Sequence, residues 1–160
     1  MGSSESKFPS MVPRKEPLNL QAFMGTWYVI SCIPTYFEKG AYNSVEHYTW
    51  NEKKQQIDIK FTYNPGSFEA KKSTIPQTAW VHNEANTEWR VSPFWPLKLP
   101  YIVLEADEEK YCVIGYPSRE YMWIMSREKS LDESLYKEIL ERLKNDHAYD
   151  LKGLYKVPHQ

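Results

Sequence analysis

Few residues in this chain of 160 amino acids have the types and spacing that catalysis or metal binding requires. The two cysteines, Cys32 and Cys112, lack the close pairing of zinc ligands, and the four histidines are scattered. No serine–histidine–aspartate set, pair of acids or phosphate-binding loop is apparent, so the thiols are the most obvious nucleophiles. The cysteines could form a disulfide, but two free thiols in a reducing compartment are the simpler interpretation. We therefore expect no metal and no cofactor.

The overall composition excludes several classes of partner. The 20 basic and 21 acidic residues are well mixed and leave a net charge of −1, which disfavours a nucleic-acid partner. No apolar run approaches the roughly 18 residues of a membrane span. Aromatic residues make up 15% of the chain, which suits a β-rich core or the lining of a cavity.

After Gly25 the apolar residues recur at every second position, which is typical of strands with one buried face. Ile57, Ile59 and Phe61, for example, alternate with Asp58 and Lys60. A proline in one strand, at position 76, favours an edge or a bulge there. Turn residues separate eight predicted strands, which span residues 26–33, 42–50, 56–63, 68–81, 87–92, 101–106, 111–116 and 121–127.

The ends of the chain follow other patterns. Residues 1–17 are predicted to be an extended lead-in to a single domain over residues 18–160, which opens with a short helical turn at 18–24. Ser130 and Glu133 form a capping box that predicts a helix to about residue 145, and residues 150–156 could add a short strand. The apolar stripe of this helix comprises Leu131, Leu135, Ile139 and Leu143.

Eight strands with short connections predict a mainly β fold, an antiparallel up-and-down barrel with the C-terminal helix packed outside it. Closure into a barrel removes exposed strand edges. A barrel of eight strands is just wide enough to hold one small ligand.

Two motifs resemble a known family. Gly25-Thr26-Trp27-Tyr28 is similar to the Gly-x-Trp signature of the lipocalins, and Tyr121-Met122-Trp123-Ile124-Met125-Ser126-Arg127 resembles their last strand. The resemblance covers residues 18–157. It is nearest to the subgroup of bacterial outer-membrane lipocalins, plant temperature-induced lipocalins and apolipoprotein D. Bacterial members carry a signal peptide and a lipid-anchoring cysteine, and from residues 1–17 we expect neither here.

The resemblance implies a calycin-type barrel and a structural role for three residues. Gly25 opens the first strand, Trp27 closes the floor of the barrel, and Arg127 lies across the Trp27 ring. Such a cation–π contact stabilises by about 1–2 kcal/mol when it is desolvated. These residues are then structural and not catalytic.

An inward-facing Trp27 sets the facing of the other side chains. Alternation along its strand places Val29, Ser31 and Ile33 inside and Cys32 outside, and leaves the facing of Cys112 open. Plain core packing is the alternative for each inward residue. We favour that alternative near the floor and ligand contact near the mouth. The other predicted ligand contacts are Tyr36, Phe37, Ile59, Phe61, Tyr63, Trp89, Val91, Tyr101, Val103, Tyr121 and Trp123, with Ile57 and Met125 also facing inward.

Two acids could also matter inside the barrel. Glu46 or Glu105, if it faced inward, could bind a ligand head group in its protonated form, because burial raises the pKa of a carboxyl group. A local twist or bulge would instead turn both to solvent, and this second interpretation is favoured.

Residues 93–100 form an unusually apolar connection that includes Phe94, Trp95, Leu97 and Leu99. This loop could contact a membrane or form the entry for a lipid, or it could fold over the barrel mouth. The N-terminal residues fit the N-myristoylation pattern at Gly2, for which a polar terminal segment or a cloning remnant is the alternative. One acyl chain alone anchors only marginally, so it would act together with such a loop.

These observations predict a protein that binds and carries a small hydrophobic ligand. Fatty acid or lysophospholipid is favoured over sterol or pigment, since the resemblance implies a link to membrane-lipid stress. The expected location is the cytoplasm, with peripheral membrane contact, and the oligomeric state stays open. One alternative is a lipocalin-fold enzyme acting on a lipid or carotenoid, similar to prostaglandin synthases or violaxanthin de-epoxidase. Another is an interaction module whose barrel is filled by its own side chains.

Overall fold

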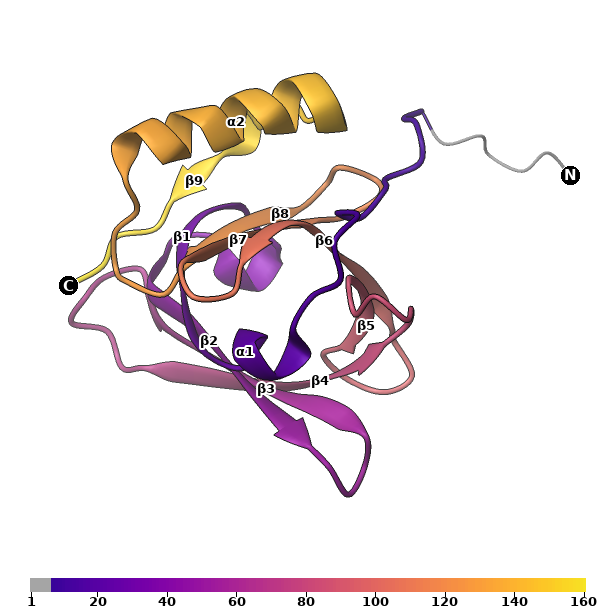
Figure 1. Ribbon diagram of the computed structural model, residues 1–160. Coiled ribbons are helices and arrows are strands. Elements are labelled where there is room, and N and C mark those ends of the chain that lie inside the picture. The colour runs from indigo at the N-terminus through magenta and orange to yellow at the C-terminus, as the bar shows by residue number, and fades with distance from the viewer. Residues whose placement is uncertain (1–6) are drawn as a thin grey trace, which may run out of the picture.

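Eight antiparallel strands follow one another around a closed barrel in the computed structural model, which describes residues 7–160 (Figure 1). Pairing of the first strand with the second closes the sheet, which confirms the predicted barrel. A short ninth strand pairs with the first. The strands are β1 Gly25–Ile33, β2 Ala41–Asn51, β3 Gln56–Pro65, β4 Ser73–Val81, β5 Glu88–Ser92, β6 Leu99–Asp107, β7 Tyr111–Gly115, β8 Met122–Ser126 and β9 Tyr155–Lys156.

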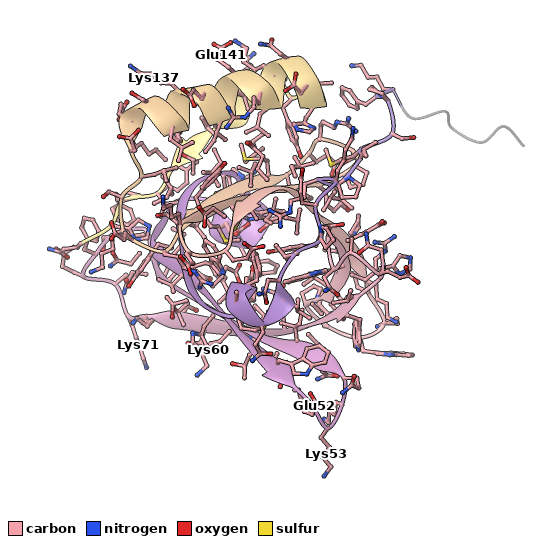
Figure 2. The ribbon with its side chains drawn as sticks, viewed as in Figure 1. Glu52, Lys53, Lys60, Lys71, Lys137 and Glu141 are labelled. Carbon is pink, nitrogen blue, oxygen red and sulfur yellow. The ribbon has the colours of Figure 1, made fainter. Side chains whose placement is uncertain are left out.

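The period of two in the sequence determines which side chains fill the barrel. On β3, Ile57, Ile59 and Phe61 are buried, whereas Lys60 between them is exposed. Lys60 points away from the barrel (Figure 2). Phe61 lies opposite Glu46 of β2 and Ile75 of β4, so the three side chains share one inward-facing row.

The helix α2 (Glu133–His147) packs outside the barrel, over the side formed by β1 and β6–β8 (Figure 1). Ile139 and Leu143 are fully buried between α2 and the sheet, in agreement with the predicted apolar stripe. The predicted capping box is wrong. Asp132 caps the helix by accepting a hydrogen bond from the Leu135 N–H, because the helix begins two residues later than Ser130 would require.

The lead-in is tied to the barrel although residues 7–17 form no helix or strand. The Arg14 N–H donates to the carbonyl of Val103 at 2.9 Å, and the Arg14 guanidinium forms an ion pair of 2.9 Å with Glu108. The short helix α1 (Leu20–Phe23) follows and lies across one end of the barrel (Figure 1). Gly2 lies outside the described residues.

Two bulges reverse the alternation on which the facing predictions depended. On β1 the register shifts between Val29 and Ser31, so Ser31 turns outward and its hydroxyl lies 2.6 Å from that of Tyr136 on α2. Ile33 also packs outside, whereas Cys32 joins the inner core. The predicted facing of these three residues is therefore wrong, because an extra residue exchanges the two faces of a strand.

The second bulge lies on β6, where the register shifts between Val103 and Glu105. Glu105 faces outward and bonds Arg142 of α2 at 2.8 Å, as the solvent-facing interpretation expected. The strand predicted over residues 68–81 is shorter, since β4 begins at Ser73. Pro76 pairs with Lys60 without a bulge, and β5 pairs β4 only from Thr78 onward. The proline therefore occupies an edge-like position, where its missing N–H costs no ladder bond.

Two 3₁₀ turns and a C-terminal tail complete the described elements. η1 (Tyr36–Glu38) lies between β1 and β2, and η2 (Leu151–Gly153) precedes β9. β9 lies beside the second half of β1, where β2 no longer pairs with it. No helix within residues 7–160 has the length and apolar content that spanning a bilayer requires.

Candidate ligand-binding cavity

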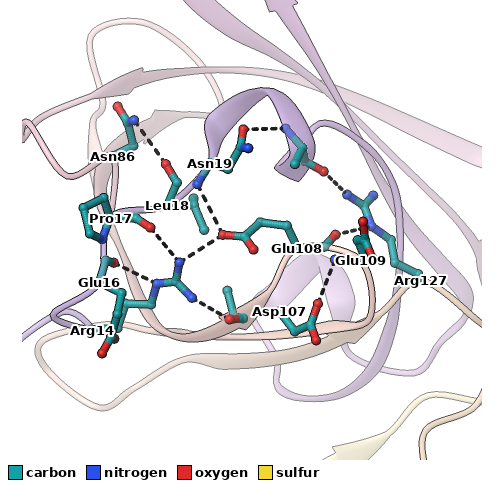
Figure 3. Close-up of polar contacts among 12 residues, drawn as sticks. Arg14, Glu16, Pro17, Leu18, Asn19, Asn86, Asp107, Glu108, Glu109 and Arg127 are labelled. Carbon is teal, nitrogen blue, oxygen red and sulfur yellow. Dashed lines mark hydrogen bonds and ion pairs between the residues drawn. The ribbon is translucent and has the colours of Figure 1, made fainter.

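The closed end of the barrel is built around Trp27 and Arg127. The guanidinium carbon of Arg127 lies 3.8 Å from the centre of the Trp27 ring, so the contact implied by the two motifs is present. Arg127 also donates to the carbonyl groups of Ala22, Met24, Thr26 and Glu108, at distances from 2.7 to 2.9 Å. The Glu108 side chain bonds Arg14 and the N–H of Asn19, so one polar network ties the lead-in and α1 to this end (Figure 3).

Aromatic rings fill the part of the barrel next to this closed end. Phe23 of α1 lies 5.0 Å from Trp27 and 5.5 Å from Trp89, measured between ring centres. Trp89 stacks on Tyr101 at 4.5 Å, and the hydroxyl groups of Tyr48 and Tyr101 are hydrogen-bonded at 2.9 Å. Plain core packing therefore describes this floor.

The upper part of the barrel is open and contains a cavity of about 550 Å³. This volume falls within the range of small-molecule sites. It also contradicts the interpretation of a barrel filled by its own side chains. The cavity is lined by Thr35, Tyr36, Phe37, Glu38, Glu46, Tyr48, Ile59, Phe61, Ile75, Gln77, Val91, Pro93, Phe94, Leu97, Leu99, Pro100, Tyr101, Tyr116, Glu120, Tyr121, Trp123 and Met125.

Eight of the predicted ligand contacts border this cavity, and ligand contact at these positions stays a prediction. They come from η1 and from β3, β5, β6 and β8 with the turn before it, segments that are distant in the sequence. The eight are Tyr36, Phe37, Ile59, Phe61, Val91, Tyr101, Tyr121 and Trp123.

The other predicted contacts lie elsewhere in the fold. Val29, Trp89 and Val103 belong to the fully buried core and do not border the cavity. Tyr63 stacks on Phe61 with ring centres 5.1 Å apart and does not reach the cavity wall. Ser31 and Ile33 face α2 because of the bulge on β1.

The mouth of the cavity carries exposed apolar side chains from two segments. In η1, Tyr36 is 82% exposed and Phe37 is 60% exposed. In the loop between β5 and β6, Trp95 is 82% exposed and Phe94 is 64% exposed, while Leu97 and Leu99 border the cavity. We call the exposed residues Tyr36, Phe37, Phe94, Trp95 and Leu97 the apolar rim.

Glu38 enters the cavity from η1 and is held by hydrogen bonds. Its carboxyl group accepts from the Trp123 indole N–H at 2.9 Å and from the Thr35 hydroxyl and N–H at 2.8 and 3.1 Å. Burial raises the pKa of Glu38, and these bonds oppose that shift because they favour the charged form. Glu38 thus links the mouth segment to β8.

Glu46 faces the cavity, contrary to the favoured expectation that it points to solvent. The reason is that β2 keeps strict alternation here, with the buried Tyr48 two positions away on the same face. Its side chain is half-buried and borders the cavity. Burial, followed by the nearby charge of Glu38, holds its pKa well above the usual range of a glutamate.

Several cavity residues were missed by sequence reasoning. Tyr48 could have been found, since residues 42–50 alternate and its partner Trp50 is apolar. Ile75 and Gln77 flank Pro76. The proline predicted an edge or a bulge in this strand, and the inward facing of its two neighbours was not predicted. Glu38 carried no sequence signal, because a short 3₁₀ turn within a loop decides its direction.

Both cysteines are free and belong to the inner core. Burial is the largest cause that raises the pKa of each thiol, so both are protonated near neutral pH. A buried protonated cysteine behaves as a small apolar residue and lacks the thiolate that nucleophilic chemistry uses. Among residues 7–160, no three His, Cys, Asp or Glu side chains converge as metal ligands.

The raised pKa of Glu46 predicts a pH-dependent stability. Below the ordinary value of 4.5 the carboxyl group is protonated in both folded and unfolded states, and the stability is fully present. As the pH rises further, the unfolded chain releases the proton first, so the free energy of unfolding falls. Glu46→Gln should therefore match the parent near pH 4 and be more stable than it at pH 8, by urea denaturation.

The environment of Glu46 allows a clear control. The titratable groups that face it are Glu38 of η1, Tyr48 of β2, Tyr101 of β6 and Cys112 of β7. Glu38 is the only carboxyl group among these, and its raised pKa acts in the same direction and remains in the variant. Glu141→Gln on the exposed face of α2 should leave the pH profile of the parent unchanged (Figure 2). Equal pH profiles for Glu46→Gln and the parent would contradict the burial of this carboxyl group.

Comparison with known proteins agrees with this geometry. The family model described as a lipocalin-like domain matches residues 18–159. Temperature-induced lipocalin-1 of Arabidopsis thaliana is 31% identical over 153 residues, which cover 88% of this chain and 79% of that protein. Outer membrane lipoprotein Blc of Vibrio cholerae is 23% identical, with 95% and 89% covered, and apolipoprotein D of Macaca fascicularis is 29% identical, with 89% and 77% covered.

Solved structures show the same fold. Lobster apocrustacyanin A1 superposes with a TM-score of 0.70 at 16% identity, over 93% of this chain and 91% of that one. The matched range contains the Trp27–Arg127 floor and every residue that lines the cavity. The chain therefore belongs to the lipocalin family.

Proposed function

We propose that the protein binds one small hydrophobic ligand in the barrel cavity and carries or stores it without transforming it. The observation that carries this proposal is the cavity of about 550 Å³, which lies above a packed aromatic floor and has a largely apolar wall. An apolar cavity favours an apolar ligand, because binding removes apolar surface of both the ligand and the wall from water. The lipocalin family supports the binding of small hydrophobic ligands.

The proposal extends to the class of ligand and to its source. A single-chain lipid, a fatty acid or a lysophospholipid, is the preferred class over a sterol or a pigment. The apolar rim supports uptake at a membrane surface, where the exposed aromatic side chains could enter the lipid interface. We place the protein in the cytoplasm with peripheral membrane contact, which its two free cysteines support.

A cavity-filling variant tests the binding site. Ile75 lines the cavity from β4, so the larger side chain in Ile75→Trp would occupy ligand space. We expect this variant to bind N-phenyl-1-naphthylamine, an uncharged fluorescent apolar probe, at least about tenfold more weakly than the parent does. Thr74→Trp is the matched control, because the neighbouring side chain on the same strand is exposed. Equal binding by the two variants would show that the ligand lies elsewhere, and the proposed cavity site would be wrong.

Removal of the apolar rim tests the membrane contact. The double variant Trp95→Ala, Leu97→Ser should bind liposomes of mixed phosphatidylcholine and anionic lipid about tenfold more weakly, since the lost side chains no longer enter the bilayer. Trp50→Ala at the far end of β2 is the control and should bind as the parent does. Liposome co-sedimentation measures both. Parent-like binding by the double variant would rule out membrane contact through this rim.

A further inference from the structure

We propose that the inner end of the ligand is a hydrogen-bond donor without negative charge, a hydroxyl group or a protonated amine, which binds the carboxyl group of Glu46. This inference rests on the proposed carrier function and specifies the ligand class for the same cavity. Among single-chain lipids it favours long-chain alcohols and amines, in place of the fatty acid and lysophospholipid preferred above, because neither of those brings an uncharged or cationic donor to the inner end.

The position of Glu46 places a polar group at the inner end of the cavity. Glu46 lies opposite Trp27 of β1 on one side and opposite Phe61 of β3 on the other. The next inward residue on the same strand, Tyr48, already belongs to the floor, where its ring stacks on Phe23 at 5.7 Å. A ligand that fills the cavity from the mouth therefore ends beside Glu46, above Tyr48 and Tyr101, which form the bottom of the cavity.

The hydrogen bonds of the two cavity acids differ. Glu38 accepts three hydrogen bonds through its two carboxyl oxygens. No side chain or backbone group in residues 7–160 donates a hydrogen bond to the carboxyl group of Glu46, although that group borders an otherwise largely apolar space. Its carboxyl oxygens keep accessible surface in the cavity, because no fully buried side-chain oxygen or nitrogen within residues 7–160 lacks a partner. A ligand that covered them without offering a donor would leave this polar group unpaired, which is costly. A ligand can supply the missing donor.

The charge of the wall determines which donor fits. Within the described chain, the charged residues lining the cavity are the acids Glu38, Glu46 and Glu120, and the lining includes no lysine, arginine or histidine. A carboxylate at the inner end would face like charges and find no cationic partner. A hydroxyl group can bond Glu46 in either protonation state, and an ammonium group can bond its ionised form.

The alternative orientation leaves Glu46 unsatisfied. If a fatty acid entered tail first, its carboxylate would remain at the mouth and its terminal methyl group would lie against Glu46. The carboxyl group would then lose its remaining water without gaining a partner. Binding in this orientation would also make the affinity independent of the head group.

Three probes with the same twelve-carbon chain test the inference at pH 8 and below their micellar concentrations. Dodecanol, dodecylamine and dodecanoate are compared for their ability to displace N-phenyl-1-naphthylamine from the full-length protein. We expect dodecanol and dodecylamine to bind at least about tenfold more tightly than dodecanoate. A tighter amine would indicate an ionised Glu46, and comparable affinities would indicate a protonated one. Both results support the donor at the inner end.

Two variants identify the residue responsible. Glu46→Gln keeps the shape but removes the negative charge, so the affinity for dodecanoate should rise and most of the preference should disappear. Glu141→Gln on the exposed face of α2, outside the cavity, is the matched control and should keep the preference of the parent. If dodecanoate binds the parent as tightly as dodecanol does, or if Glu46→Gln keeps the full preference, the inference is wrong while the carrier function stands. If the naphthylamine probe itself does not bind, the carrier function is wrong and the inference falls with it.

Discussion

Trp27→Ala is expected to lower the free energy of unfolding by about 3–5 kcal/mol, the usual cost of removing a buried tryptophan. The Trp27 side chain is 0% exposed, contacts Phe23 and carries the Arg127 guanidinium on its face. Its indole N–H also donates to the carbonyl of Phe23 at 2.8 Å, which ties α1 to the barrel. The truncation therefore leaves a cavity at the floor and frees the short helix. Urea denaturation, with unchanged dependence on denaturant, measures the loss.

A matched substitution separates this effect from the loss of any tryptophan. Trp95 is 82% exposed on the apolar rim, so Trp95→Ala should change the stability by less than about 0.5 kcal/mol. If Trp27→Ala proves too unstable to purify, Trp27→Phe keeps most of the ring and should show a smaller loss in the same direction. A loss for Trp27→Ala no greater than that for Trp95→Ala would refute the role of Trp27 as the floor of the barrel.

Arg127→Lys should cost about 2–3 kcal/mol although it conserves the charge. The planar guanidinium donates to four backbone carbonyl groups, and its carbon lies over the Trp27 ring, 3.8 Å from the ring centre. A lysine has a single ammonium group and cannot make this set of contacts at once. The first effect should be loosening of α1, whose end supplies two of the carbonyl groups through Ala22 and Met24. Hydrogen exchange of α1 amides, together with urea denaturation, measures both.

The surface offers a control for the same exchange. Arg90 forms a partly exposed ion pair with Glu88 at 3.2 Å, so Arg90→Lys should stay within about 0.5 kcal/mol of the parent. Equal stabilities of the Arg127→Lys and Arg90→Lys variants would mean that Arg127 contributes through its charge alone and that the fourfold carbonyl contact is unimportant.

The features predicted well from the sequence are those that depend on regular periodicity. Alternation in β3 placed Ile59 and Phe61 in the barrel, and the stripe of α2 placed Ile139 and Leu143 beneath the helix. The two motifs brought Trp27 and Arg127 together from the two ends of the barrel sequence. Each of these signals repeats over many residues or is carried by an unusual residue pair.

The errors come from single residues that break the periodicity. The extra residue on β1 moved Ser31 and Ile33 outside and Cys32 inside, and no local composition marks it. The error at Glu46 has the opposite cause. A charged residue suggested a twist or bulge that would turn it to solvent, but β2 alternates regularly at this position and the side chain faces inward. Burial of that acid makes sense only once a cavity is known to lie in front of it, and the cavity is formed by segments that are remote in the chain.

The C-terminal strand has a consequence for how the molecules meet one another. β9 pairs with Ser31 and Cys32 of β1, and beyond it the Asn43 N–H donates to the carbonyl of Pro158 at 2.8 Å. The tail therefore covers the seam where β1 and β2 have separated. A chain cut before Tyr155 would leave this stretch of β1 as a bare edge, able to recruit a strand from a neighbouring copy. The last residues thus shield a strand edge that would otherwise favour self-association, as well as extending the sheet.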